Sequence, residues 1–202
     1  MTQVISPTVT FVDALAAGRA EWRLAVRAGA VLFVTALTAA AAQISVPLPF
    51  TAVPFTFQPM VVLLGGLALG STLGMTSQML YLFAGIVGLP VFAASATLSP
   101  GALRLLGPTG GYLMVYPFAA FLTGYLSQRG FDRRYATAVV AMVAGLALVY
   151  GSGATWLAIS TGMGASAAFA AGVAPFIVAD LLKLLAAAGI LPAFWKLLGR
   201  AG

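Results

Sequence analysis

The sequence contains no cysteine and no histidine, and only four of its 202 residues are Asp or Glu. Without cysteine there can be no disulfide framework or thiol chemistry, and without histidine the commonest general base, metal ligand and proton shuttle are missing. A serine nucleophile would have no histidine partner, and four scattered carboxylates do not form an acid–base pair. We therefore expect no enzyme, no catalytic residue, no metal site and no cofactor.

Charge is scarce, and apolar residues take its place. Hydrophobic residues make up 61% of the chain and charged residues 7%, with a mean hydropathy of +1.05. A soluble domain cannot hide this many apolar side chains in one core, so the composition predicts an integral membrane protein that lies in a lipid bilayer. The formal net charge of +6 is explained by basic residues that mark one side of the bilayer, and nucleic acid is not an expected partner.

The predicted fold class is an all-α integral membrane protein with six transmembrane helices in one domain, residues 1–202. Loops rich in Pro and Gly separate the apolar segments, because neither residue suits a helix interior. The predicted spans are about 24–44, 57–69, 72–87, 110–127, 135–152 and 174–195. Before them, residues 1–23 form an N-terminal segment that is either a short interfacial helix, with Trp22 at headgroup level, or a frayed end.

The basic residues predict the orientation of these spans. With six spans both termini share a side, and eight of the ten cations fall on that side, which the positive-inside rule makes cytoplasmic. These eight are Arg19, Arg23, Arg27, Arg129, Arg133, Arg134, Lys196 and Arg200. We expect a multi-pass protein of the plasma or inner membrane, with Arg104 in an outer loop and Lys183 inside the membrane.

Asp180 and Lys183 are two charges within the last predicted span. Residues three apart share a helix face, and a lone charge at membrane depth costs about 2.5–3.5 kcal/mol, so the pair should face the bundle interior or a wet cavity. One interpretation is an ion pair that only holds the spans in register, and another is ligand recognition. A proton-coupled carrier that uses Asp180 is disfavoured, because the chain has no duplicated halves with paired broken helices.

Three stretches rich in Pro, Gly or small residues lie on the same outer side as this pair. They cover residues 46–56, 88–109 and 152–172, and we expect them to form ordered loops above a pocket. The stretch 152–172 also fits a partly helical hairpin.

Several polar and small residues are open to two interpretations. Gln58, Tyr81 and Tyr112 lie near the ends of their spans, where they fit either interface anchoring and packing or ligand contact. Ala36 and Ala40 give one helix face only small side chains, for packing within the bundle or for docking of a partner helix. The segment Gly107–Gly111 lacks the Lys and Ser of a Walker motif, so it predicts close backbone packing and no nucleotide site.

Four motifs in this order resemble one known family. They are Pro47–Phe50 with Val53–Gln58, Tyr81 with Gly88–Ala93, Gly107–Leu113, and Gly172–Lys183. Together they resemble the BioY family, the biotin-specific substrate-binding components of energy-coupling-factor (ECF) transporters. The segment Ala94–Arg104 departs from the family, which tends to be richer in glycine there.

The resemblance implies a six-helix membrane subunit that captures biotin from outside with high affinity. It further implies partners, a transmembrane coupling subunit and cytoplasmic ATPase subunits, with docking through the first helix at Ala36 and Ala40. Because the chain has no Walker motif, energy for transport would come from these partners.

Biotin has a ureido ring, an apolar thioether ring and a carboxylate, so its site needs polar groups at two ends and apolar walls between them. Our hypothesis is that Lys183 supplies positive potential for an oxygen of the ligand, and that Asp180 accepts a ureido N–H or orients Lys183. Which end of biotin each residue meets stays open. The candidate binding residues are Asp180, Lys183, Gln58, Tyr81, Phe55, Phe92, Tyr112 and Arg104.

Overall fold

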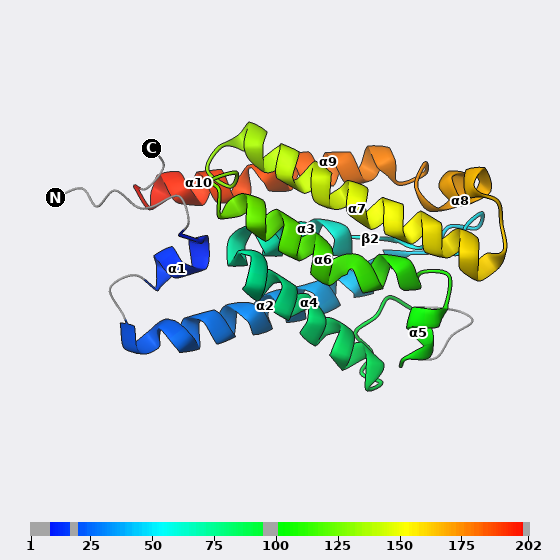
Figure 1. The fold of residues 1–202 in the computed structure, drawn as a ribbon, viewed down its shortest axis with the longest axis horizontal. Helices are drawn as coiled ribbons and strands as arrows, with labels where there is room; N and C mark the ends of the chain where they lie inside the picture. Colours follow the sequence, from blue (N-terminus) through cyan, green and yellow to red (C-terminus); the bar gives the residue numbers. More distant parts are fainter. Residues whose placement is uncertain (1–8, 17–19, 95–100, 200–202) are drawn as a thin grey trace.

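A computed structural model describes residues 9–16, 20–94 and 101–199 of the chain. Arg19 and Arg200, which the orientation argument uses, and residues 95–100 of the outer stretch 88–109 lie outside these ranges. The described chain is a helix bundle with two short strands (Figure 1). In order, the elements are α1 Phe11–Leu15, the 3-10 helix Ala20–Trp22, α2 Arg23–Gln43, β1 Ser45–Val46, β2 Phe55–Thr56, α3 Gln58–Leu69, α4 Ser71–Ile86, α5 Leu103–Leu106, α6 Gly110–Ser127, α7 Tyr135–Thr161, α8 Ala165–Gly172, α9 Ile177–Ala188 and α10 Ile190–Leu197.

Helix α6 lies at the centre of the bundle, packed against α3, α4 and α7 (Figure 1). Twelve of its eighteen residues are buried, which requires small side chains where neighbouring backbones come close. A Cβ built on Gly66 of α3 would lie 2.4 Å from the carbonyl oxygen of Ala120 in α6. The two helices therefore pack backbone against backbone, and Gly66 has no room for a side chain.

Four helices have bounds within one residue of the predicted ranges: α2, α3, α4 and α6. Among the described residues, three segments are long and apolar enough to cross a bilayer: Arg23–Gln43, Tyr135–Thr161 and Ile177–Leu197. Helix α3 has only 12 residues, or about 18 Å at about 1.5 Å per residue, well short of the roughly 30 Å hydrocarbon layer. Its length leaves space for loops and a cavity within the membrane thickness.

The predicted end of the helix at residue 152 is wrong, because α7 continues for nine more residues to Thr161. The small residues in this stretch serve packing and do not end the helix: the Ser152 hydroxyl donates to the carbonyl oxygen of Gly111 at 3.0 Å. The turn comes only at Gly162, whose φ of 71° lies in the left-handed region that suits glycine. The prediction of a loop over 152–172 therefore holds for a few residues before α8 only, and the alternative, a partly helical hairpin, is confirmed.

The last apolar segment is divided into α9 and α10 at Gly189. Pro192 has no N–H to donate to the carbonyl four residues earlier, so the regular ladder is interrupted there. The two helices still follow one another along the bundle (Figure 1).

The bundle has two different ends. At the cavity end, β1 pairs antiparallel with β2, with Ser45 opposite Thr56, and α5 and α8 lie nearby (Figure 1). At the terminal end lie α1, α10 and the turn between α6 and α7. Of the two interpretations of the N-terminal segment, the helical one holds for Phe11–Leu15 and Ala20–Trp22.

We expect Gly66→Ala to destabilise the protein, because its Cβ would also lie 2.2 Å from the Thr123 hydroxyl oxygen. Overpacking of this kind costs about 1–3 kcal/mol of unfolding free energy, and the melting temperature in detergent should fall. Gly29→Ala in α2 is the matched control, since nothing lies within 4 Å of its Cβ. Equal melting temperatures for the two variants would contradict the close packing of α3 and α6.

Candidate ligand-binding site

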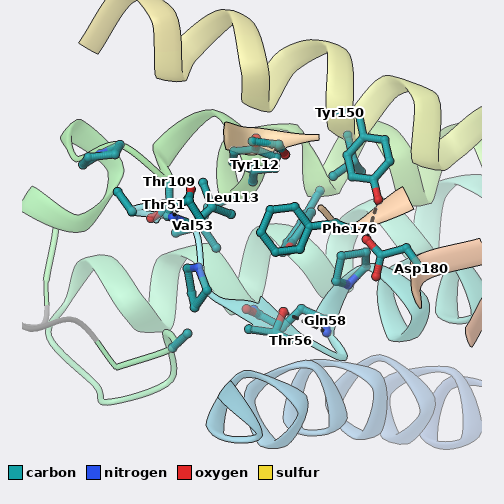
Figure 2. A pocket seen from close by; sticks show the side chains of 18 of the residues that line it. Thr51, Val53, Thr56, Gln58, Thr109, Tyr112, Leu113, Tyr150, Phe176 and Asp180 are labelled. Carbon is teal, nitrogen blue, oxygen red and sulfur yellow. Dashed lines mark hydrogen bonds between the residues drawn. The ribbon is translucent and has the colours of Figure 1, made fainter. Parts of the chain in front are cut away.

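A cavity of about 290 Å³ opens among the helices at the cavity end (Figure 2). This volume is near the lower end of the roughly 300–1,000 Å³ of small-molecule sites. Its walls come from many parts of the chain: the loop between β1 and β2, the start of α3, the segment after α4, α5 and the segment that leads into α6, the first half of α6, the middle of α7, the end of α8, and the start of α9 with the segment before it. The loop contributes Pro47, Thr51, Ala52, Val53 and Pro54, so it covers the cavity.

Three helices begin at this cavity. Lining residues include Gln58 at the start of α3, Thr109 just before α6, and Phe176 just before α9. The first backbone N–H groups of a helix lack partners within the helix, and the helix dipole makes this end positive. The converging helix starts therefore favour a ligand that carries hydrogen-bond acceptors or negative charge.

Asp180 lies in the wall of the cavity with two partners. Lys183 Nζ is 2.5 Å from Asp180 Oδ1, and the Tyr150 hydroxyl donates to Asp180 Oδ2 at 2.6 Å (Figure 2). The prediction that Asp180 and Lys183 share a helix face is confirmed. A carboxylate offers about four lone-pair positions, so Asp180 retains acceptor capacity for an N–H group of a ligand.

Lys183 turns away from the cavity and is not among the residues that line it. Its ammonium donates to the carbonyl oxygen of Thr56 at 2.7 Å and lies 3.9 Å from the ring centre of Phe55. The Thr56 carbonyl and the ion pair use two of the three donors of the ammonium group, and the Phe55 ring adds a cation–π contact. Lys183 thus neutralises Asp180 and ties α9 to β2.

Gln58 is supported from behind by Tyr81. Gln58 lines the cavity, and its Nε2 donates to the Tyr81 hydroxyl at 2.6 Å. Tyr81 in turn donates to the carbonyl oxygen of Val91 at 3.2 Å and packs edge-on against Phe92, with ring centres 5.4 Å apart. Tyr81 and Phe92 therefore hold Gln58 and the segment after α4 in position without lining the cavity.

Arg104 lines the cavity from α5 and is buried. Its Nη2 donates to the carbonyl oxygen of Ala93. Burial lowers the pKa of the Arg104 guanidinium from its ordinary value, but an arginine stays protonated at neutral pH. Arg104 is thus a cation in the wall, contributed by a different part of the chain from Asp180.

The segment Gly107–Gly111 serves close packing, as predicted. A Cβ on Gly111 would lie 2.2 Å from the Cβ of Trp156 in α7, and the Trp156 indole N–H donates to the carbonyl oxygen of Gly107 at 2.9 Å. Tyr112, which follows this segment, lines the cavity and donates to the carbonyl oxygen of Gly172 at 2.7 Å. These contacts fix the start of α6 against α7 and α8.

The eight candidate residues fall into two groups. Asp180, Gln58, Tyr112 and Arg104 line the cavity, whereas Lys183, Tyr81, Phe55 and Phe92 lie behind its walls. Within the described ranges, no group of three or more Asp and Glu residues lies close enough to hold a metal ion.

The sequence reasoning missed much of the wall. Tyr150, Val149 and Leu113 line the cavity from α7 and α6, and Phe176 lies between the Tyr150–Asp180 pair and the Thr109 side (Figure 2). A single tyrosine within an apolar run, such as Tyr150, predicts a hydrogen-bond partner elsewhere in the bundle, because a buried hydroxyl needs one. That signal does not say which helix supplies the partner.

The fold and the cavity define an integral membrane protein with a cavity of small-molecule size at one end. The family model described as "BioY family" matches residues 17–200. The chain belongs to the BioY family.

Individual relatives agree with this family. A protein of Pyrococcus horikoshii named "Probable biotin transporter BioY" is 44% identical over 152 residues, which cover 75% of this chain and 85% of the relative. "Biotin transporter BioY" of Rhizobium etli is 33% identical, with 84% of this chain and 88% of the relative covered. "Biotin transporter BioY" of Thermotoga maritima is 38% identical, with 76% and 86% covered.

A solved structure shares the fold. It is described as the S-component for biotin from an ECF-type ABC transporter, and it matches with a TM-score of 0.78 at 24% sequence identity. The match covers 89% of this chain and 95% of the solved one.

Proposed function

We propose that this protein is the biotin-binding membrane subunit of an ECF-type uptake transporter and that it captures biotin from the outer side of the cell membrane. The names of its relatives and the biotin S-component with the same fold support this proposal. The single observation that carries it is the cavity, which has an anionic acceptor at Asp180, a cation at Arg104 and apolar side chains in its walls.

The ureido ring of biotin occupies the Asp180 side in this proposal. A carboxylate accepts hydrogen bonds, and the ureido ring supplies N–H donors, so the two groups are complementary. A biotin carboxylate at this position would be repelled by the Asp180 carboxylate. The Lys183 ammonium does not compensate, because it is already directed to Asp180 and Thr56. Lys183 then acts through Asp180 and does not meet the ligand.

The carboxylate of biotin occupies the Arg104 side. Arg104 supplies positive charge, and the start of α6 next to Thr109 adds the positive end of a helix dipole. Between the two ends, Leu113, Val149 and Phe176 form apolar walls for the thioether ring and the aliphatic chain.

The proposed topology has six spans: α2, α3, α4, α6, α7, and α9 with α10. Both termini lie on the cytoplasmic side, and the cavity end faces outward. The cations in and next to the terminal end support this orientation by the positive-inside rule. In the described chain they are Arg23, Arg27, Arg129, Arg133, Arg134 and Lys196.

A transmembrane coupling subunit docks on α2 in this proposal, and cytoplasmic ATPase subunits supply the energy. Ala36 and Ala40 are both exposed on α2, one turn of helix apart, so a second helix could approach the backbone closely between them.

Two variants test the Asp180 side. Asp180→Asn should weaken biotin binding about 10- to 100-fold, since hydrogen bonds to a charged group contribute about 1.5–3 kcal/mol. Tyr150→Phe should weaken it roughly 3- to 10-fold through loss of one neutral donor that holds Asp180. Titration calorimetry of the purified protein measures both dissociation constants.

Tyr125→Phe is the matched control for Tyr150→Phe, because Tyr125 is exposed and bonded to Arg129, away from the cavity. Its biotin affinity should equal that of the unmodified protein. Melting curves without biotin establish that each variant is folded. Wild-type affinity in a folded Asp180→Asn variant would leave the ion pair as a structural element only.

Arg104→Gln tests the opposite side with two ligands. Biotinamide lacks the negative charge of biotin, so the unmodified protein should prefer biotin, and Arg104→Gln should abolish that preference. The affinity for biotin should fall about tenfold or more, as expected for loss of one charge-assisted bond. Arg134→Gln, at an exposed position of the terminal end, should leave both affinities unchanged. Equal losses for biotin and biotinamide would reject the assignment of the carboxylate to Arg104.

Ala36→Trp tests the docking face. A bulky side chain on the exposed face of α2 should prevent assembly with the coupling subunit, measured by copurification, and should leave biotin affinity intact. Val178→Trp adds the same bulk at an exposed position of α9 and serves as the control. Assembly of Ala36→Trp at the unmodified level would contradict docking through this face.

A further inference from the structure

The first part of α2 has little hold on the bundle through its own side chains. In residues 23–30, all of which the structure describes, no side chain is buried. The buried residues of α2 begin at Val31 and continue to Ala42. The partly buried Val26 and Ala30 pack against an apolar cluster to which α1 contributes Val12, so α1 helps to fix the N-terminal third of this helix.

Helix α1 lies between this part of α2 and the rest of the bundle (Figure 1). Its Val12 belongs to a small apolar cluster with Val34 of α2 and Leu69 of α3, whereas its Ala14 belongs to the main core. Both residues are buried. Helix α1 thus contributes to both apolar clusters.

A partly exposed ion pair links α1 to α2. Asp13 Oδ1 accepts from Arg27 at two positions, Nε at 2.9 Å and Nη2 at 2.6 Å. Asp13 is oriented by Thr10, which caps α1: the Asp13 N–H donates to the Thr10 hydroxyl at 3.1 Å, and that hydroxyl donates to Asp13 Oδ2 at 3.0 Å. Both donors of the guanidinium meet one carboxylate oxygen, and this charge-assisted contact joins α1 to α2.

On its other side, α1 and the residue before its cap are bound to the terminal end of the bundle. Arg133 Nη2 donates to the carbonyl oxygen of Val9 at 3.0 Å. Phe11 packs edge-on against Trp195 of α10, with ring centres 5.6 Å apart, and against Phe194 at 5.7 Å.

Trp195 and Arg133, which contact α1 and Val9, are themselves held by further contacts. The Trp195 indole N–H donates to Asp132 Oδ2 at 2.6 Å, and both residues are fully buried. The Arg133 guanidinium lies 3.5 Å from the centre of the Trp195 ring. The turn between α6 and α7 and helix α10 therefore form one rigid base for α1, well away from the cavity.

We propose that α1 is a strap that holds the N-terminal third of α2 against the bundle and so sets the direction of the exposed face that carries Ala36 and Ala40. The strap itself follows from the contacts of α1 alone. Its role in presenting that face to a helical membrane partner rests on the proposed function.

Spin labels can measure the strap directly, because the chain has no cysteine that would be labelled by accident. Leu24→Cys on α2 and Val140→Cys on α7 are both exposed, at 80% and 56%, and neither contacts α1 in the interactions described above. We expect a narrow distribution of label distances in this doubly labelled protein. Adding Arg27→Gln and Phe11→Ala should broaden the distribution, since both attachments of α1 are then lost.

The matched control carries Arg23→Gln and Leu15→Ala. It removes the same charge from the same helix end and the same kind of side chain from α1, but at exposed positions. Its distance distribution should stay narrow. Biotin affinity should be unchanged in both variants, because the strap lies at the other end of the bundle.

An unchanged distribution in the folded Arg27→Gln, Phe11→Ala protein would overturn the strap. If the double variant fails to fold, Arg27→Gln alone provides the same test with the aromatic contacts intact. A broadened distribution with reduced copurification of the coupling subunit supports both the strap and its role in docking. A broadened distribution with full copurification supports the strap and rejects docking through the face that it orients.

Discussion

The ion pair of Asp180 and Lys183 constrains the whole cavity end of the bundle. Their side chains are only 8% and 9% exposed, and a lone charge at membrane depth costs about 2.5–3.5 kcal/mol. The pair is tolerated because each charge has further partners, Tyr150 for the carboxylate and Thr56 for the ammonium. Since these partners come from α7 and β2, the pair can exist only where α9, α7 and the hairpin meet.

That meeting point requires short helices. The hairpin of β1 and β2 lies inside the bundle because α3 is short. With only 12 residues, α3 does not extend as far toward the cavity end as the 27-residue α7 (Figure 1). The starts of α6 and α9 face the same space. Backbone polar groups that are not in a helix must find partners at membrane depth, and here they lie around the cavity.

How far the sequence predicts this molecule differs from feature to feature. Pro and Gly in the loops predicted the bounds of α2, α3, α4 and α6, because these residues act locally on the backbone. The predicted helix end at residue 152 was wrong for a non-local reason: the small residues there look like a loop, yet they allow α7 to lie against Gly111 and Tyr112.

The candidate site shows the same division. The spacing of Asp180 and Lys183 predicted their shared face, since three residues along a helix leave no other geometry. The direction of the Lys183 side chain could not be predicted, because it depends on the Phe55 ring and the Thr56 carbonyl. Thr56 lies 127 residues before Lys183 in the chain. Tyr150 was missed for the same reason, since only the packing of α7 beside α9 brings its hydroxyl to Asp180.

Helix α2 follows a different principle, because in lipid the hydrophobic effect does not drive one apolar helix onto another. Hydrogen bonds locate it: the Thr35 hydroxyl donates to the carbonyl oxygen of Ser77 at 2.9 Å, and Gln78 Nε2 donates to the Thr38 hydroxyl at 3.2 Å. These contacts join the middle of α2 to α4, and the ion pair of Asp13 with Arg27 joins its first third to α1. Polar contacts on the inner face thus hold α2 in place, and the exposed surface carries Ala36 and Ala40 among large apolar side chains such as Phe33 and Leu37.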